Sequence, residues 1–302
     1  MSYLVKQTVK GHEYFYLVKN QRQEHGWSKC KLYLGKQAPD NVRLRAYENE
    51  LEAKARNPQR IRTARKLQKH AFLSKEEIST LESTRKSSVP EINEKNDIDF
   101  LIRFTFNSNK IEGSTMTLLD TKLVIEDEIA PSGKKLREIY EAKNMEAAYS
   151  FVKNYEKDLS RKFILTTHRM LMDHIIPDAG GFRKKRVKIT GSEFLPPKPE
   201  DLDEEMDRFL SFYRFIKKKY HPVEVASLVH IKFVQLHPFT DGNGRVARLL
   251  LNFVLMKNGY LPLIIKDKNK EKYYTLLEST HEEKDYLSFI RFVYECLKEE
   301  YI

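Results

Sequence analysis

The chain has 302 residues, of which 40% are hydrophobic, enough for one large domain or two smaller ones. Its 54 Lys and Arg exceed its 43 Asp and Glu and give a formal net charge of +11. No motif that reads DNA or RNA accompanies this charge. We therefore expect a lysine-rich surface or an acidic protein partner, and no nucleic-acid partner. There is no apolar run of 18 residues, no secretory leader, and no disulfide framework from Cys30 and Cys296, so we expect a cytoplasmic protein without a membrane partner.

The first part of the chain predicts β-structure. Stretches rich in Tyr, Val and Leu, separated by short turn signals, are typical of a three-stranded antiparallel meander. They are residues 3–9, 14–19 and 29–34. We assign residues 1–38 to this meander, whose role the sequence does not reveal.

Residues 39–90 predict a helical linker region. A polar, basic stretch at 42–56 has helical character, and Ser74 with Glu77 predicts the capping box of a further helix. The segment 86–90, which contains Ser and Pro, is the predicted domain boundary.

From residue 91 to residue 302 the apolar pattern predicts helix after helix, and therefore a mainly α fold. Within 97–110, apolar residues at helical spacing predict an amphipathic helix. They are Ile98, Leu101, Ile102 and Phe106. The helices are interrupted at 178–199 by a stretch rich in glycine, lysine and proline.

The most informative stretch is 237–248, which reads His-Pro-Phe-Thr-Asp-Gly-Asn-Gly-Arg-Val-Ala-Arg. The segments 223–236 and 246–256 on either side are mostly apolar, and both predict helices that are buried on most sides. The loop between them would therefore hold His237 at the end of one helix and a ring of backbone N–H groups at the start of the next. Such a helix start is a ready anion site.

The glycines of this loop suit a polyphosphate. Gly242 and Gly244 allow positive φ and let the backbone approach phosphate oxygens closely. Asn243 between them tolerates the left-handed conformation and can donate a hydrogen bond.

The charged residues of the loop suit the same ligand. Asp241 offers a hard oxygen to Mg²⁺, which usually binds one or two carboxylates together with substrate phosphates. Arg245 and Arg248 are three residues apart on one helical face, and their planar guanidinium groups match phosphate. His237 titrates near neutrality and can accept a proton from a hydroxyl.

The run 237–248 resembles the Fic family signature, His-x-Phe-x-Asp/Glu-Gly-Asn-Gly-Arg-x-x-Arg, at every fixed position, and the similarity extends over about 93–302. The resemblance implies a Fic-type helical core with a small β-hairpin flap that clamps a target segment. The flap residues would be Val187, Lys188 and Ile189. The implied reaction is transfer of AMP from ATP to a Ser, Thr or Tyr hydroxyl of a protein.

The resemblance also implies a role for each motif residue. His237 would deprotonate the hydroxyl, and Asp241 would hold Mg²⁺ or Mn²⁺ on the α- and β-phosphates. Asn243, Gly244 and neighbouring amides, including that of Gly242, would stabilise charge on the α-phosphate. Arg245 would grip the β- and γ-phosphates.

A second match lies upstream, where Ser108, Glu112 and Gly113 fit the family's inhibitory motif Ser/Thr-x-x-x-Glu-Gly/Asn. In the family, this glutamate pairs with the second motif arginine, here Arg248, and obstructs the seat of the γ-phosphate. The resemblance therefore implies a self-inhibited enzyme whose inhibitory helix covers about 97–113.

Other residues leave alternatives open. Tyr274 is a candidate wall for the adenine or a core residue, and His281 stands where relatives often have Asn, which puts base selectivity in question. His230 is interpreted as a core residue, and His168 and His174 lack zinc-ligand spacing. Alternative functions are removal of AMP from a modified protein, with Glu112 orienting water, or nucleotide binding without turnover. Homo-oligomerisation and the target are left open.

Overall fold

The computed structural model describes residues 2–9, 12–23, 26–35, 71–83, 85, 94–189, 192–282 and 285–302. The chain divides into two compact units, Met1–His70 and Ala71–Ile302. The predicted helical stretch 42–56 and the predicted boundary segment 86–90 lie outside the described residues.

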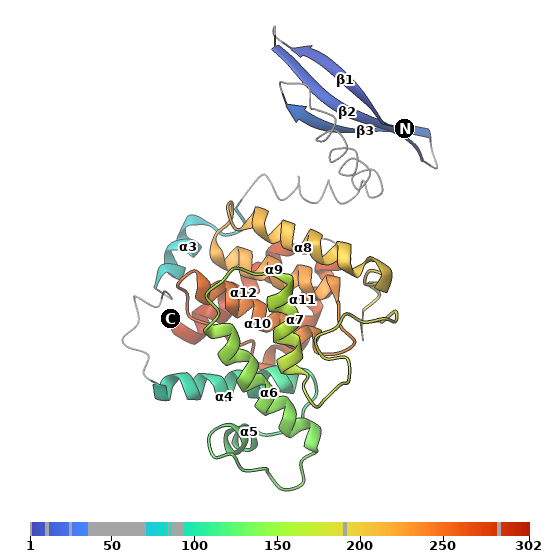
Figure 1. The fold of residues 1–302 in the computed structure, drawn as a ribbon. Coiled ribbons are helices and arrows are strands. Elements are labelled where there is room, and N and C mark those ends of the chain that lie inside the picture. Colours follow the sequence, from blue (N-terminus) through green and yellow to red (C-terminus); the bar gives the residue numbers. More distant parts are fainter. Residues whose placement is uncertain are drawn as a thin grey trace. The chain divides into compact units, whose positions relative to one another are not determined.

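The first unit contains the predicted meander (Figure 1). Strands β1 (Ser2–Val9), β2 (His12–Gln23) and β3 (Gly26–Gly35) form an antiparallel sheet in the order β1-β2-β3. Tyr16 on the central strand pairs with Val5 on one side and Tyr33 on the other, next to an irregularity in the register. The three-stranded arrangement is therefore confirmed.

The described part of the second unit is built from α-helices (Figure 1). Their bounds are α3 Lys75–Glu82, α4 Glu94–Ile111, α5 Leu118–Ile125, α6 Leu136–Lys153, α7 Arg161–Leu171, α8 Leu202–Ile216, α9 Pro222–Leu236, α10 Asn243–Lys257, α11 Lys270–Glu282 and α12 Tyr286–Tyr301. Short 3₁₀ turns lie at Pro199–Asp201 and Asp267–Asn269. The predicted mainly α class is confirmed. Within the described residues, every helix is too short or too polar to cross a bilayer.

Helices α9 and α10 form the centre of this unit, and nearly all their side chains are buried. Both are apolar around most of their circumference, which is why neighbouring helices pack on several sides of them. Helix α9 begins with Pro222 at its first position, where the missing N–H costs no hydrogen bond. This rigid pair of helices carries the 237–248 loop between them.

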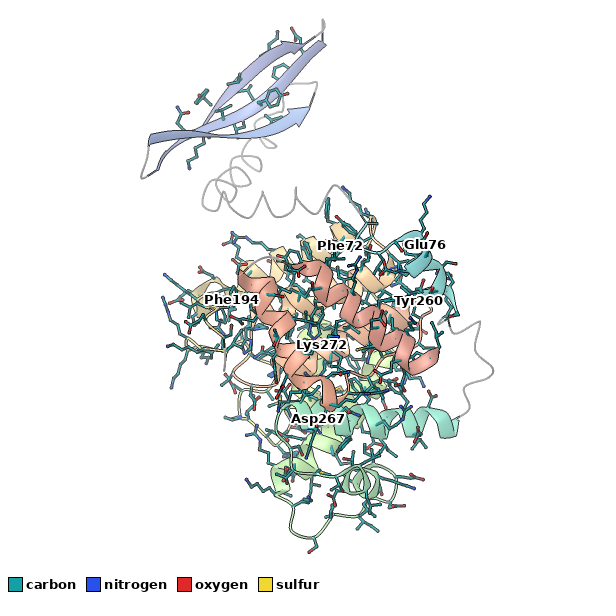
Figure 2. All side chains as sticks on the ribbon, turned by 180° about the vertical axis from the view of Figure 1, so that it is seen from behind. Phe72, Glu76, Phe194, Tyr260, Asp267 and Lys272 are labelled. Carbon is teal, nitrogen blue, oxygen red and sulfur yellow. The ribbon has the colours of Figure 1, made fainter. Side chains whose placement is uncertain are left out.

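Helix α3 belongs to the second unit although it precedes the predicted boundary at 86–90. The buried carboxylate of Glu224 in α9 accepts hydrogen bonds from the amides of Phe72 (2.6 Å) and Leu73 (2.8 Å). The hydroxyl of Tyr260 donates to Glu82 at 2.9 Å, and Figure 2 shows Glu76 and Tyr260 in the same part of this unit. A buried carboxylate needs hydrogen-bond donors, and these contacts tie Phe72 and Leu73 to the second unit, which starts at Ala71.

The predicted β-hairpin flap is not a hairpin of strands in the described residues. Residues 186–189 and 192–198 are irregular, and the amide of Ser192 bonds the carbonyl of Ile189 at 3.1 Å. Pro196 and Pro197 lack the N–H groups that a strand ladder would need. Residues 190–191 lie outside the described residues, so the hairpin of the flap stays a prediction.

Candidate active site at the start of helix α10

The loop between α9 and α10 turns at two left-handed residues. His237 ends α9 with φ 45°, and its amide still bonds the carbonyl of Phe233 at 3.0 Å. Gly242 caps α10 with φ 79°, and a Cβ there would lie 2.8 Å from Sδ of Met172. The chain needs glycine at 242 for both conformation and space, whereas left-handed His237 stores strain of the kind found at functional sites.

Asn243 closes the loop onto itself. Its side-chain oxygen accepts from the amide of Phe239 at 3.0 Å, and its side-chain nitrogen donates to the carbonyl of the same residue at 2.9 Å. Asn243 and Phe239 are both buried. The side chain of Asn243 therefore holds the loop, and its contribution to an anion site would come from its backbone N–H at the helix start.

His168 in α7 supports the same loop, a role that no sequence pattern predicts. Its ring lies parallel to Phe239, with 3.6 Å between the ring centroids. The amide of Gly180 donates to its Nδ1 at 2.9 Å, so Nε2 carries the proton and donates to the carbonyl of Asp241 at 3.1 Å. Burial is the main reason that the pKa of His168 falls to about 4, which keeps this arrangement neutral.

One ring nitrogen of His237, Nε2, has no hydrogen-bond partner among the described residues. Nδ1 lies 3.3 Å from the carbonyl of Val234, and a carbonyl only accepts hydrogen bonds, so Nδ1 carries the proton and Nε2 is left as the acceptor. Burial, together with the positive charge of Arg183, lowers the pKa of His237 to about 4. The ring is therefore neutral and able to accept a proton at neutral pH.

Arg183 ties the loop of residues 178–199 to His237. Its Nε donates to the carbonyl of His237 at 2.8 Å. Its two terminal nitrogens donate to the carbonyls of Lys185 (3.1 Å) and Pro197 (2.5 Å). One buried guanidinium thus fixes the base and both ends of the expected flap, an effect that residue spacing could not reveal.

Asp241 is bound by cationic and amide donors. Its Oδ1 accepts from the amide of Gly242 at 2.6 Å and lies 3.4 Å from Nη2 of Arg245. Its Oδ2 lies 2.5 Å from Nη2 of Arg137, which projects from α6. Burial alone would raise the pKa of Asp241, but Arg245, the Gly242 amide and Arg137 outweigh it and hold that pKa below the usual value.

Arg245 lies beneath the loop with a 2% exposed side chain. Its Nη1 is 3.2 Å from Oε1 of Glu141 in α6, and its Nη2 faces Asp241. In the described structure it therefore braces Asp241, and it has no such contact with Glu112.

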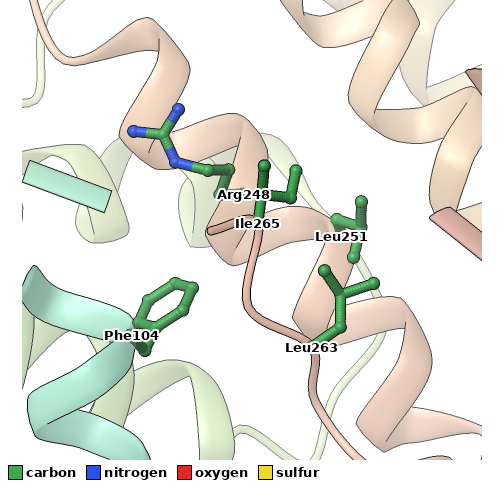
Figure 3. A pocket seen from close by; sticks show the side chains of 5 residues that line it. All are labelled: Phe104, Arg248, Leu251, Leu263 and Ile265. Atoms are coloured by element: carbon green, nitrogen blue, oxygen red, sulfur yellow. The ribbon is translucent and has the colours of Figure 1, made fainter. Parts of the chain in front are cut away.

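Arg248 meets the end of helix α4. Its Nε donates to the hydroxyl of Ser108 at 2.8 Å, and its Nη2 donates to the Ser108 carbonyl at 2.9 Å and to Oε1 of Glu112 at 2.7 Å. Figure 3 shows its guanidinium pointing away from the apolar crevice that holds its stem. That crevice is lined by Phe104, Leu251, Leu263 and Ile265. The two partners of the expected inhibitory pair are thus in contact.

Glu112 also lies over the start of α10. A Cβ placed on Gly244 would be only 2.5 Å from its Oε1. The Glu112 side chain is 33% exposed, and Gly113 beyond it turns the chain with φ 99°. A carboxylate therefore sits at the helix N-terminus where an anion is expected to bind.

The tyrosines of α11 differ in their surroundings. Tyr273 is buried, and its hydroxyl bonds Nε2 of His230 at 3.1 Å, so His230 is a core residue as predicted. Tyr274 is 42% exposed and donates to the carbonyl of Ile111 at 3.3 Å. The ring of His281 stacks on Phe194, with centroids 4.2 Å apart.

The fold thus brings together the residues singled out in the sequence from α4, the 237–248 run and α11. The flap residues stand apart from this cluster: Lys188 is exposed, Val187 and Ile189 are half-buried, and their link to it is Arg183. Residues that complete the site without a sequence signal are Arg137, Glu141 and His168, whereas Arg183 belongs to the run Gly181-Phe182-Arg183, which resembles the family's approach to the flap.

Comparisons with known proteins agree with this arrangement. Residues 158–255 match the model of the Fic/DOC family. A protein adenylyltransferase Fic from Aedes aegypti is 37% identical over 201 residues, which cover 65% of this chain and 40% of that protein. One of the same name from Nematostella vectensis is 38% identical over 197 residues, covering 63% and 45%. The chain spans less than half the length of these relatives.

Solved structures show the same fold. A Fic domain containing signaling protein from Bacteroides thetaiotaomicron superposes with a TM-score of 0.67 at 28% identity, over 74% of this chain and 94% of that one. Fic-1 from C. elegans superposes with a TM-score of 0.66 at 26% identity, over 84% and 74%. With the signature run folded between two central helices and these matches in sequence and fold, residues 158–255 form a domain of the Fic/DOC family.

Proposed function

We propose that this chain transfers AMP from ATP to a hydroxyl side chain of a protein and that Glu112 inhibits it. The observation that carries the proposal is the contact between Glu112 and Arg248 at the start of α10, beside a histidine with a free ring nitrogen. An anion site and a proton acceptor in one loop suit nucleotidyl transfer to a hydroxyl. The names of the curated relatives support the same activity.

ATP would bind with its phosphates at the start of α10. The first N–H groups of a helix have no partner within the helix, and Gly244 has no side chain to keep a phosphate away. Arg248 adds a buried guanidinium whose stem is fixed by packing. The carboxylate of Glu112 supports this assignment because it is itself an anion held there.

His237 would accept the proton of the attacking hydroxyl at Nε2. The hydroxyl oxygen forms a bond to the α-phosphorus of ATP, the bond from that phosphorus to the bridging oxygen breaks, and pyrophosphate leaves. A pKa of about 4 keeps the ring neutral at pH 7 but makes it a weak base. Stabilisation of charge on the phosphates would therefore contribute more than proton transfer.

Asp241 would hold Mg²⁺ or Mn²⁺. The donor set fits, because one ionised carboxylate with substrate phosphates is a common arrangement for Mg²⁺, and its oxygen Oδ2 is bound only by the half-exposed Arg137 among the described residues. A bound divalent cation would neutralise charge on the triphosphate. Arg245 and the Gly242 amide would keep the Asp241 carboxylate oriented and ionised.

Glu112 would inhibit by occupying the place of a phosphate. Any phosphate oxygen that binds Nη2 of Arg248 must displace the Glu112 carboxylate, which would otherwise repel it. The half-exposed Tyr274 would border the adenine, and Val187, Lys188 and Ile189 would contact the target segment.

Removal of AMP from a modified protein is the second candidate. It is favoured by the partly exposed carboxylate of Glu112, whose Oε2 makes no hydrogen bond in the described structure and could orient a water molecule. In that case the wild-type protein should release AMP from a pre-modified target, and Glu112→Gly should not. Nucleotide binding without turnover would make no use of the free Nε2 of His237.

The proposal is tested by the position of the transferred label. Purified protein is incubated with ATP labelled at the α- or the γ-phosphate, for the wild type, His237→Ala and the control His174→Ala, which changes an exposed histidine. We expect protein-bound label from α-labelled ATP only, lost in His237→Ala and kept in His174→Ala, with ATP affinity of His237→Ala within a few fold of wild type. Label from γ-labelled ATP would contradict nucleotidyl transfer.

A further inference from the structure

The loop that Arg183 fixes to His237 carries a strip of positive charge. Residues 183–188 read Arg-Lys-Lys-Arg-Val-Lys. Arg183 is buried, whereas the four other cationic side chains are exposed. We call these four the basic strip: Lys184, Lys185, Arg186 and Lys188.

The basic strip lacks acidic partners in the described structure. None of its four side chains forms an ion pair or a hydrogen bond with another described residue, although elsewhere Arg161 and Arg208 each bind two carboxylates. Neighbouring like charges repel each other, and nothing in the described structure neutralises them. A ligand of opposite charge would relieve this repulsion.

The strip begins beside the catalytic base. Arg183 immediately precedes it and bonds the carbonyl of His237 at 2.8 Å and that of Lys185 at 3.1 Å. Through Arg183, the strip is thus anchored to the backbone of His237, the proposed base. A strongly basic surface at this position affects which polypeptide can present its hydroxyl.

The aromatic rings flanking the strip favour a protein over a nucleic acid. Single-stranded nucleic acids bind through aromatic faces on which bases stack, in addition to charge. The ring of Phe182 is covered by the guanidinium of Arg161 at 5.8 Å, and the ring of Phe194 is stacked on His281. Both rings already have partners, so the strip offers charge without a free stacking platform.

We infer that the basic strip docks an acidic segment of the protein target and thereby presents the target hydroxyl to His237. The inference rests on the proposed transfer reaction and adds the chemistry of its substrate, a polypeptide in which Asp or Glu flank the modified residue. Binding should weaken as salt is raised, because exposed charges are screened over about 8–10 Å at physiological ionic strength.

The test measures binding without catalysis. Fluorescein-labelled 12-residue peptides that alternate Thr with Glu, Gln or Lys are titrated with the full chain, and anisotropy is recorded at two salt concentrations. One variant replaces all four strip residues by Gln. A matched variant replaces four exposed lysines elsewhere by Gln, namely Lys75, Lys157, Lys218 and Lys298. Both lose the same charge, and their folding is checked by thermal melting.

We expect the Glu peptide to bind more tightly than the Gln and Lys peptides, and the strip variant to lose at least about tenfold in affinity, equivalent to about 1.4 kcal/mol. The matched variant should stay within about twofold. Equal binding of the Glu and Gln peptides, or an equal loss in both variants, would overturn the inference. So would tighter binding of a 12-nucleotide single-stranded DNA, or displacement of the peptide by ATP.

Label transfer from α-labelled ATP is recorded on the same samples. Lack of any transfer in the Glu112→Gly background, with charge-dependent peptide binding intact, would refute the proposed function and leave an acidic-peptide site. Transfer of label together with peptide binding that does not depend on the peptide's charge would refute the docking inference and leave the proposed function standing.

Discussion

The carboxylate of Glu112 occupies the space that any side chain on Gly244 would need. Its Oε1 lies 2.5 Å from the position of a Cβ on Gly244 and is held by Nη2 of Arg248 at 2.7 Å. Because Gly244 has no side chain, the Glu112 carboxylate can reach Arg248, and a phosphate could approach the same backbone in the proposed reaction. Gly244 lies in α10 and Glu112 lies in the turn directly after α4, and their coupling can be measured.

Gly244→Ala should destabilise the protein by about 1–2 kcal/mol, because its methyl group forces the Glu112 carboxylate away from Arg248. In the Glu112→Gly background the same substitution should have little effect. Urea unfolding of the four proteins of this double-mutant cycle gives the coupling. An equal loss in both backgrounds would show that the Gly244 backbone, and not Glu112, sets the constraint.

Arg137→Gln should strengthen divalent metal binding. Arg137 lies 2.5 Å from Oδ2 of Asp241, and both side chains are substantially exposed, so the pair is worth roughly 0.2–1 kcal/mol and its loss should lower the Mn²⁺ dissociation constant by a few fold. Electron paramagnetic resonance of free Mn²⁺, with ATP present in the Glu112→Gly background, measures this. Lys143→Gln on the same helix is the control, and unchanged or weaker binding in Arg137→Gln would contradict competition for Asp241.

His230 should make stability depend on pH. Burial, with a contribution from Arg248, lowers its pKa to about 3 from about 6.5 in the unfolded chain. Between pH 6.5 and 4.5 only the unfolded state gains this proton. The contribution of His230 to the free energy of unfolding is therefore complete above pH 6.5 and is lost as pH falls, which lowers that free energy by about 2 kcal/mol at pH 4.5. His230→Gln should lack that part of the fall in urea unfolding. The exposed His174→Gln should keep it, and equal falls in all three proteins would show that His230 does not titrate as described.

A fragment beginning at Ala71 should be more stable than one beginning at Glu91. The shorter fragment removes the two amide donors to the buried Glu224 carboxylate, each worth about 1.5–3 kcal/mol. It also removes the buried side chains of Leu73 and Leu81. We expect the free energy of unfolding to differ by at least about 3 kcal/mol. Equal values would favour the boundary near residue 90.

The sequence could predict those parts of the site whose reactive residues stand close together along the chain. His237, Asp241 and Arg248 stand within one run, and the apolar segments beside it predict α9 and α10. The contact of Glu112 with Arg248 was expected from the family resemblance. Residue spacing could not have given it, since the two are 136 positions apart.

The supporting contacts could not be predicted. His168 bonds a carbonyl 73 residues away and Arg183 one 54 residues away, and backbone carbonyls carry no sequence signal. The need of Glu224 for donors from Phe72 and Leu73, which ties these residues to α9, appears only once α9 is buried. The bonds of Arg183 to the carbonyls of Lys185 and Pro197, which hold the two sides of the expected flap, likewise involve backbone groups.

The central claim is that Glu112 holds a productive ATP site closed through Arg248, and the most direct test is the rate of AMP incorporation in Glu112→Gly. Removing a charge-assisted pair worth roughly 1.5–3 kcal/mol should raise incorporation from α-labelled ATP about ten- to a hundredfold. Arg248→Ala should not mimic it, because ATP needs the same guanidinium, and the control Glu126→Gly, at an exposed helix end, should match the wild type. Incorporation in Glu112→Gly that equals the wild type would contradict the claim.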